Sequence, residues 1–321
     1  MFGSWALRVA WDAPADVVIT GTDPIFSVGA SLPWKWNRSG STKLAHWCFD
    51  LYPEAMFAEG ILNPNGLPGR VGNYLSRWFL GNQDLIANLG SCMETLISRQ
   101  VPSVYQTTLT PWAIAEPSQQ PHVNAAIRKE LFGDAKLCLL YSGSFGRAHS
   151  FAEILSLARG LRGESISFCF AVRGNRVTQL KQSISAEDTN IRFAGFASEE
   201  ELEARLASAD IHVASLRPEW TGCVVPSKFF GSLAIGRPVL FAGSGTSALA
   251  RWIGDHDLGW VVSNENLVEV SEKLKLLARN KESLAQMQSH CFATYKAHFS
   301  KEIVLDKWDG HLRALINSGK N

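Results

Sequence analysis

The sequence has little charge and no excess of either sign. Its 321 residues include 31 Lys and Arg against 30 Asp and Glu, which gives a net charge of +1, and 46% of the chain is apolar. So many apolar residues exclude a disordered chain. The balanced charge also excludes the general basic field that recruits nucleic acid, so we expect no nucleic-acid partner.

Long apolar runs are missing as well. No run approaches the roughly 18 residues that a membrane-spanning helix needs. The first residues, MFGSWALRVAW, also lack the apolar core and the cleavage site of a signal peptide. These absences predict a soluble cytoplasmic chain.

Clustered cysteines are a third absence. The six cysteines lie at least 31 residues apart, without a CxxC pair or a Cys/His cluster. We therefore expect neither a disulfide scaffold nor a metal site. The apolar surroundings of most of these cysteines favour buried free thiols.

Tryptophans and charged residues are distributed unevenly along the chain. Residues 1–112 hold seven of the eleven tryptophans but only 15 of the 61 charged residues (31 plus 30). Pro111, Pro117 and Pro121 then interrupt any regular element, which marks a linker. We therefore expect a first domain over 1–113, a second over 114–300 and a C-terminal helix over 301–321.

Short apolar runs alternate with stretches of helical period, the pattern of a parallel sheet wrapped by helices. Before the linker the candidate strands are ADVVITG, KLAHWCF, DLIANL and VYQTTLT. After it the predicted strands cover residues 137–142, 166–172, 191–195, 210–216, 237–242 and 259–263. The expected fold class is α/β, with two Rossmann-like doubly wound domains and a cleft between them, the first domain incomplete.

One predicted strand-to-helix turn combines glycines with a cation. In YSGSFGRAH, Gly143 and Gly146 let the backbone approach a ligand closely. Ser144, Arg147 and the start of the next helix offer donors to an anion such as a diphosphate. The turn matches neither the GxGxxG dinucleotide fingerprint nor the GxxxxGK[ST] phosphate loop. The alternative is a tight turn whose glycines serve geometry alone.

A second turn, SLRPEWTGCVVPSKFFG, follows the strand predicted at 210–216. Thr221 and Gly222 can present backbone donors, while Ser227 and Lys228 stand where a helix is expected to begin. Because both turns lie at the carboxyl ends of strands in one sheet, they predict a site for a nucleotide diphosphate. The alternatives are a solvated surface lysine for Lys228 and an ordinary loop acid for Glu219.

These segments resemble the donor-binding domain of GT-B glycosyltransferases of family 4, in the bacterial branch that builds capsular, colanic-acid and O-antigen polysaccharides. The resemblance rests on YSGSFGRAH, NIRFAGF and SADIHVASLRPEWTGCVVPSKFFGSLAIGRPVLFAG, and it extends to HWCFDLYPEAMFAEGIL and DLIANLGSCMETLISRQVP. It implies transfer of a sugar, with retained anomeric configuration, from a nucleotide diphosphate donor that is most often UDP-linked. It implies no obligatory metal or other cofactor, and a last helix that crosses back to the first domain.

The resemblance also implies which residues bind the donor. Its phosphate loop matches Gly143, Ser144, Gly146 and Arg147, its second phosphate turn matches Gly222, Ser227 and Lys228, and its approach to the nucleoside matches Gly174 and Asn175. The leaving diphosphate gains negative charge as the glycosidic bond breaks. Arg147 and Lys228 would supply the positive charge that a divalent metal supplies in other enzymes.

Two departures from the family pattern concern acids. Where many members have two glutamates eight positions apart, this chain has Cys223 and Gly231. Glu219 is the nearest acid and the candidate for sugar contact. In the first domain Asp50 is the second catalytic candidate, and Glu54 is a further cleft candidate. The alternative is that Asp50 caps the following helix and Glu54 lies in its first turn.

The acceptor implied by the resemblance is a glycan or a polyprenyl-linked glycan at the inner face of the plasma membrane. Two segments that mix Trp with Arg, residues 5–11 and 70–80, could make a peripheral membrane contact. Core-facing helices explain the same pattern, and we favour that interpretation.

Two other functions stay open. A nucleotide-sugar epimerase of the same architecture would convert the donor without an acceptor, and a non-catalytic or partial glycosyltransferase would only bind nucleotide. The second alternative follows from length, because the ADVVITG strand arrives by residue 20. The family's opening strand and glycine-rich loop then have no room, which predicts a short first domain with an uncovered sheet edge.

Overall fold

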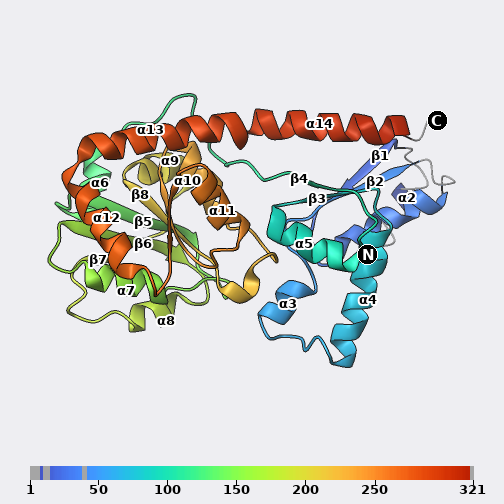
Figure 1. The fold of residues 1–321 in the computed structure, drawn as a ribbon, viewed down its shortest axis with the longest axis horizontal. Helices are drawn as coiled ribbons and strands as arrows, with labels where there is room; N and C mark the ends of the chain where they lie inside the picture. Colours follow the sequence, from blue (N-terminus) through green and yellow to red (C-terminus); the bar gives the residue numbers. More distant parts are fainter. Residues whose placement is uncertain (1–7, 10–14, 38–41, 319–321) are drawn as a thin grey trace. The chain divides into compact units, whose positions relative to one another are not determined.

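Two compact units make up the chain in a computed structural model that describes residues 8–9, 15–37 and 42–318 (Figure 1). The first unit comprises Met1–Pro111, Glu219–Val225 and Glu302–Asn321, and the second comprises Trp112–Pro218 and Pro226–Lys301. The chain thus passes from one unit to the other after Pro111, within two residues of the expected boundary. The segment Glu219–Val225, expected in the second domain, belongs to the first unit.

The first unit is built on a parallel sheet whose strands follow chain order. The sheet contains β1 (Val17–Thr20), β2 (Lys43–Trp47), β3 (Leu85–Asn88) and β4 (Gln106–Thr108). All four candidate strands of this half are therefore confirmed. β1 forms one edge of the sheet, where Ile19 is 49% exposed.

Helices around this sheet come from both ends of the chain. They are the 3-10 helix η1 (Ser27–Ser31), α2 (Leu32–Asn37), α3 (Glu54–Ala58), α4 (Leu67–Gly81), α5 (Ser91–Gln100) and α14 (Lys301–Ser318). Trp308 of α14 packs on Trp47 of β2, with ring centroids 5.3 Å apart. His311 lies 3.2 Å from the Tyr105 hydroxyl and 3.0 Å from the Thr107 hydroxyl. The C-terminal helix is thus held on the first unit by an aromatic contact and two hydrogen bonds.

The second unit has a larger parallel sheet whose strand order reverses. The order β10-β9-β8-β5-β6-β7 joins β5 (Leu137–Ser144), β6 (Ile166–Arg173), β7 (Ile191–Ala194), β8 (Ile211–Ser215), β9 (Val239–Ala242) and β10 (Gly259–Val262). These are the six strands predicted after the linker. The order runs outward in both directions from the neighbours β5 and β8, so a crevice opens between them at their carboxyl ends.

Helices cover both faces of the second sheet. They are α6 (Ala125–Phe132), α7 (Ala152–Gly160), α8 (Val177–Gln182), α9 (Glu199–Ala207), α10 (Lys228–Ala234), α11 (Ala248–Asp255), α12 (Leu267–Arg279) and α13 (Lys281–His298). Alternate residues of β5 serve the two faces. Leu139 packs in the core with α7 and α12, whereas Leu140 packs in the core with α6 and α9. This two-sided burial explains why β5 reads as a continuous apolar run.

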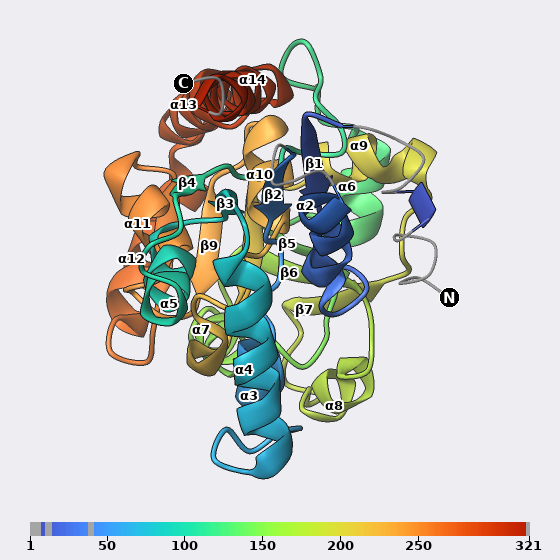
Figure 2. The same cartoon turned by 90° about the vertical axis from the view of Figure 1, so that its right-hand side faces the viewer.

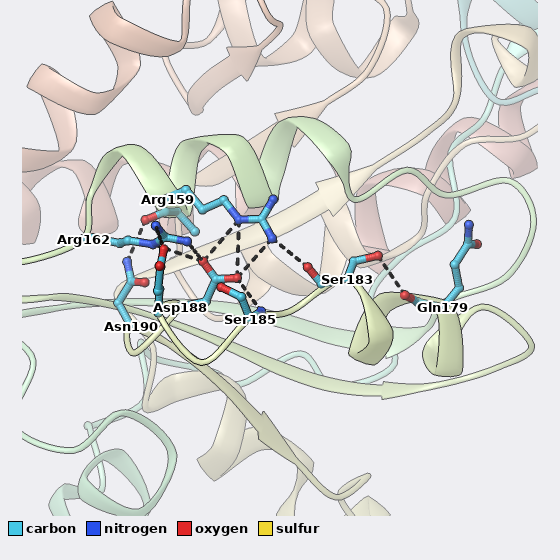
Figure 3. Close-up of polar contacts among 9 residues, drawn as sticks. Arg159, Arg162, Gln179, Ser183, Ser185, Asp188 and Asn190 are labelled. Atoms are coloured by element: carbon cyan, nitrogen blue, oxygen red, sulfur yellow. Dashed lines mark hydrogen bonds and ion pairs between the residues drawn. The ribbon is translucent and has the colours of Figure 1, made fainter.

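A buried carboxylate ties α7 to the loop before β7 (Figure 3). Asp188 is 3% exposed, and its carboxylate pairs with Arg159 at 3.1 Å and also with Arg162. The backbone N–H of Ser185 donates a further hydrogen bond of 2.9 Å to it. These partners, Arg159 first, hold the pKa of Asp188 well below its usual range. Asp188 is therefore an ionised, fully satisfied structural acid.

The cysteines are as the sequence predicts, since all six are free and five are buried. Burial raises the pKa of the Cys169 thiol to about 12, so it stays protonated at neutral pH. Within the described ranges, no helix combines the length and apolar character needed to cross a bilayer. Those ranges also hold no group of three or more His, Cys, Asp or Glu side chains placed to bind a metal ion.

Candidate functional site

A cavity of about 320 Å³ lies in the second unit, where the strand order reverses. The end of β5, the start of β8, helices α9 and α10 and the linker after Trp112 form its walls. Its lining residues include Ser142, Gly143, Ser144, Phe196, Ser227, Lys228 and Gly231. Open α/β sheets bind ligands at this point because the crevice between diverging helices exposes strand ends and helix starts.

Lys228, the first residue of α10, places its ammonium beside the end of β5. Its Nζ donates a 3.0 Å hydrogen bond to the Ser144 carbonyl and lies 5.0 Å from the centre of the Tyr141 ring. Burial lowers the pKa of Lys228 to about 8. A carbonyl dipole and an aromatic face do not cancel its positive charge, so the cavity keeps a desolvated cation that favours an anionic ligand.

Gly143 makes room for this lysine. Its φ of 124° is one that side chains rarely adopt, and a Cβ at this position would lie 2.9 Å from Cε of Lys228. The structure thus brings Gly143, Ser144, Ser227 and Lys228 to one cavity, although they come from two turns far apart in the sequence. The alternative that Gly143 serves turn geometry alone explains its φ. It does not explain why a side chain at this position would collide with Lys228.

Gly146, Arg147 and His149 of the first turn are not among the residues that line the cavity. Arg147 is exposed, and its carbonyl accepts a 3.4 Å hydrogen bond from Arg217. A Cβ on Gly146 would meet no atom within 4 Å, so space does not require glycine there. His149 donates from Nδ1 to the Ser215 carbonyl at 2.6 Å. Burial, and then the charge of Lys228, lower the pKa of His149 to about 4, so it is a neutral residue with a local structural role.

Gly174 and Asn175, the predicted nucleoside contacts, follow β6. Gly174 has a φ of 131°, and a Cβ there would lie 2.6 Å from the carbonyl oxygen of Phe145. This close approach of two loops gives a structural reason for the glycine. Asn175 is exposed. Contact of either residue with a nucleoside stays a prediction.

In the first unit, Asp50 follows β2 and lies near Asp23, which follows β1. The Thr22 hydroxyl accepts hydrogen bonds from the N–H groups of Phe49 and Asp50, at 2.8 and 3.3 Å. Burial, and then the charge of Asp23, raise the pKa of Asp50. The interpretation of Asp50 as a helix cap is wrong, because the next helix, α3, has Pro53 as its N-cap residue and no side-chain cap.

Glu54 is a second acid of this region and does lie in the first turn of α3. Its Oε1 accepts a hydrogen bond from Gln100, whereas Oε2 is buried without a hydrogen-bond partner among the described residues. Burial raises the pKa of Glu54. Two carboxyl groups with raised pKa values therefore lie after β2 in the first unit.

The segment Glu219–Val225 joins this acidic region and not the cavity lining. Val224 forms an antiparallel bridge with Asp50, and the Leu51 N–H donates a 2.8 Å hydrogen bond to the Cys223 carbonyl. Gly222 has a φ of 86°, and a Cβ there would lie 2.9 Å from the Cys92 carbonyl oxygen. Thr221 and Gly222 are therefore placed with the first unit, as is the exposed Glu219.

Sequence reasoning missed part of the cavity wall. Phe196 lines the cavity, is 45% exposed and has the Arg173 guanidinium 4.2 Å from its ring centre. Phe196 lies two residues after β7, and this position near the carboxyl end of a strand could have identified it as a candidate site residue. Residues 112–115 also line the cavity, although the sequence identified them only as linker.

Comparisons with known proteins agree with this architecture. The family model described as glycosyl transferases group 1 matches residues 123–290. The probable glycosyltransferase WbjE of Pseudomonas aeruginosa is 23% identical over 95% of this chain and 76% of its own length.

Solved structures show the same fold. TarM of S. aureus has a TM-score of 0.68 at 13% identity, over 98% of this chain but only 58% of its own. HepE of Anabaena, solved with UDP, has a TM-score of 0.70 at 11% identity, over 97% of this chain and 82% of its own. The fold is GT-B, with the smaller sheet first, and the family model matches more than half of the chain. The chain therefore belongs to the glycosyl transferases of group 1.

Proposed function

We propose that this protein is a retaining glycosyltransferase. It moves a sugar from a nucleotide diphosphate, with UDP as the first candidate, to a glycan or lipid-linked glycan in cell-surface polysaccharide synthesis. The observation that carries the proposal is the desolvated ammonium of Lys228 in the cavity beside Gly143.

The donor diphosphate would bind at the carboxyl end of β5. Lys228 and Arg147 supply positive charge, and the backbone around Gly143 and Ser144 approaches the phosphates without side chains in the way. As the bond to the sugar breaks, negative charge builds on the leaving diphosphate, and fixed cations stabilise that state more than the ground state. The chain's own residues therefore supply the charge, and the proposal needs no cofactor.

Recognition of the nucleoside would differ from the common family pattern. Gly231 lines the cavity at the position where many members have a glutamate for the ribose. We propose that Gly174, Asn175 and the exposed ring of Phe196 contact the nucleoside instead. An aromatic face next to a polar loop suits a planar base.

Asp50 and Glu219 are the proposed catalytic acids. The raised pKa of Asp50 suits a group that exchanges a hydrogen bond or a proton with a sugar hydroxyl. Glu219 is exposed on a segment bound beside Asp50 through the bridge at Val224. Thr221 and Gly222 of the same segment are proposed to position these acids, with donor contact through their backbone.

The proposed setting is the inner face of the plasma membrane, where a polyprenyl-linked acceptor would be held. The relative WbjE is named a probable glycosyltransferase, which supports sugar transfer, whereas the polysaccharide assignment rests on the resemblance of the sequence segments. UDP is the first donor candidate because the HepE structure contains it.

The test is to incubate the protein with UDP-, GDP- and ADP-linked sugars and lipid extract, and to follow nucleotide release and lipid labelling. Transfer from one donor, strongly reduced in Asp50→Asn and also reduced in Lys228→Ala, is the expected result. The product's anomeric configuration, measured by NMR, must match that of the donor. Conversion of the donor sugar without any acceptor would establish the epimerase instead. Nucleotide binding without either reaction would establish a non-catalytic binding protein.

A further inference from the structure

Helix α4 buries its small residues and exposes its large apolar residues, the reverse of an ordinary surface helix. Its buried positions are small residues and one leucine, namely Gly69, Gly72, Ser76 and Leu80. Its large apolar side chains point outward, with Leu67 77%, Val71 49%, Tyr74 70% and Trp78 42% exposed. The expected core-facing orientation of this segment is therefore wrong for Val71, Tyr74 and Trp78. A surface helix normally buries its apolar stripe, so the reversal needs an explanation.

Close packing fixes this orientation. A Cβ on Gly69 would lie 2.1 Å from the Asn63 carbonyl oxygen, and one on Gly72 would lie 3.5 Å from Pro53. The Ser76 hydroxyl donates a 3.0 Å hydrogen bond to the Tyr52 carbonyl. Because the backbone at Asn63 leaves no room for a side chain at Gly69, the first turns of the helix cannot rotate to bury the large apolar residues on this side. The packing of the buried side of α4 therefore keeps the large apolar side chains exposed.

The outward apolar residues form one continuous stripe. At about 100° per residue, Leu67, Val71, Tyr74 and Trp78 fall within an arc of roughly 60° along the whole helix. Trp36 of α2 extends the stripe sideways, since it is 62% exposed and its ring lies 6.2 Å from that of Trp78. Figures 1 and 2 show α4 as an outer helix whose first turns extend beyond the sheet of the first unit.

Positive charge flanks the stripe on one side. Arg70 and Arg77 are both exposed, and α4 contains no acidic residue. Tryptophan and tyrosine have an apolar body with one polar group, and arginine has an apolar stem with a charged head. These are the side chains that settle at the boundary between lipid headgroups and acyl chains. An apolar stripe with guanidinium groups along its edge is the arrangement of a helix that lies in a bilayer interface, with its apolar face among the acyl chains and its basic groups at lipid phosphates.

We propose that this α4 face, formed by Leu67, Arg70, Val71, Tyr74, Arg77 and Trp78 with Trp36, docks on an anionic lipid bilayer. The helix lies parallel to the membrane surface, with the apolar stripe among the upper acyl chains and both guanidinium groups at lipid phosphates. Its length of 15 residues, about 22 Å at 1.5 Å per residue, allows shallow contact along one side. The proposal does not depend on sugar transfer, since it rests on the α4 face alone.

The test is flotation of the whole protein with vesicles of phosphatidylcholine, either alone or mixed equally with phosphatidylglycerol. The protein is expected to float with the anionic vesicles. Tyr74→Ser with Trp78→Ser removes the central aromatic residues and is expected to weaken binding at least about ten-fold. Arg70→Gln and Arg77→Gln are each expected to weaken binding about five-fold, on anionic vesicles only and less at high salt.

A matched control separates this surface from general stickiness. Val268 and Leu276 of α12 are 79% and 65% exposed, so Val268→Ser with Leu276→Ser removes comparable apolar surface from another helix. That variant is expected to float as the parent does. Thermal melting and UDP titration of all variants show whether each is folded.

The proposal would be overturned by results of two kinds, either in the flotation itself or in the association state of the protein. One is the absence of flotation with anionic vesicles, or flotation that Tyr74→Ser with Trp78→Ser leaves unchanged. The other is self-association without lipid that the same variant abolishes, which would assign the α4 face to a second copy of the chain. Failure of UDP to bind the parent protein, by contrast, would count against the proposed function and leave the lipid surface standing.

Discussion

The buried acid Asp188 of the second unit and the half-buried acids Asp50 and Glu54 of the first unit have pKa values shifted in opposite directions. In the second unit Asp188 is enclosed by Arg159 and Arg162, and its pKa lies well below the usual range. In the first unit burial raises the pKa values of Asp50 and Glu54. An acid with a lowered pKa stabilises the fold when ionised, whereas an acid with a raised pKa is held at a cost to folding. The direction of the pKa shift therefore distinguishes the structural acid Asp188 from Asp50 and Glu54, which are candidates for a functional role.

The largest expected effect comes from removing the structural acid. Asp188→Ala leaves two guanidinium groups without their shared partner, but both side chains are partly exposed and can reach water. We therefore expect a loss of about 3 kcal/mol in the free energy of unfolding, at the low end for a broken buried pair. Urea denaturation at neutral pH measures it, with UDP affinity unchanged. An unchanged midpoint would remove Asp188 from its structural role.

The same comparison predicts a pH dependence. The pKa of Asp188 is lower in the folded chain than the value of about 3.9 in an unfolded chain. Its stabilising contribution is therefore complete above about pH 4 and is lost as the pH falls through the folded-state pKa. Below pH 4 the parent and Asp188→Ala should converge in stability, which denaturation across an acid series would show.

Asp50→Asn should have the opposite pattern. Because Asp50 is a proposed catalytic acid, this substitution is expected to lower kcat about 100-fold, within the usual range for a group that transfers protons. Because the pKa of Asp50 is raised in the folded chain, ionising it lowers stability as the pH rises above about 4. The variant should therefore be more stable than the parent at neutral pH while being less active. A less stable variant would contradict this assignment.

The smallest of these effects concerns the cavity itself. Gly143→Ala forces a side chain into a φ of 124° and against Cε of Lys228. We expect UDP binding to weaken roughly ten-fold through the displaced lysine, a change of about 1–2 kcal/mol. Gly146→Ala is the matched control, since a Cβ there meets no atom within 4 Å. Equal losses in both variants would mean that turn geometry, and not the lysine, controls binding.

Much of the fold could be predicted from the sequence because strand cores are continuous apolar runs. All ten candidate strands form, from β1 to β10. The meeting of Gly143 and Lys228 could also be predicted, since Gly143 lies near the carboxyl end of β5, Lys228 begins the helix that comes after β8, and these two strands are neighbours. The carboxyl ends of parallel strands lie at the same edge of a sheet. The prediction of this meeting therefore depended only on finding the strands.

The remaining features depend on packing that no local pattern reveals. The period of α4 shows that it is amphipathic, but the choice of its inner face depends on the loop at Asn63 and on Pro53. The segment at Gly222 follows a strand of the second unit, yet its contacts with Cys92 and Leu51 place it with the first. Gly174 matched a family position, whereas the close approach of Phe145 gives it a structural role that only coordinates show.

Calorimetric titration of UDP into the protein tests whether Lys228 forms the donor site. We expect saturable binding at pH 7 that Lys228→Ala weakens roughly 30-fold, or about 2 kcal/mol for a charged hydrogen bond. Since the pKa of Lys228 is about 8, binding should weaken as the pH rises above 8, and Lys228→Arg should remove that dependence. Absence of UDP binding by the parent, or binding that Lys228→Ala leaves unchanged at pH 7, would show that Lys228 does not form a donor site.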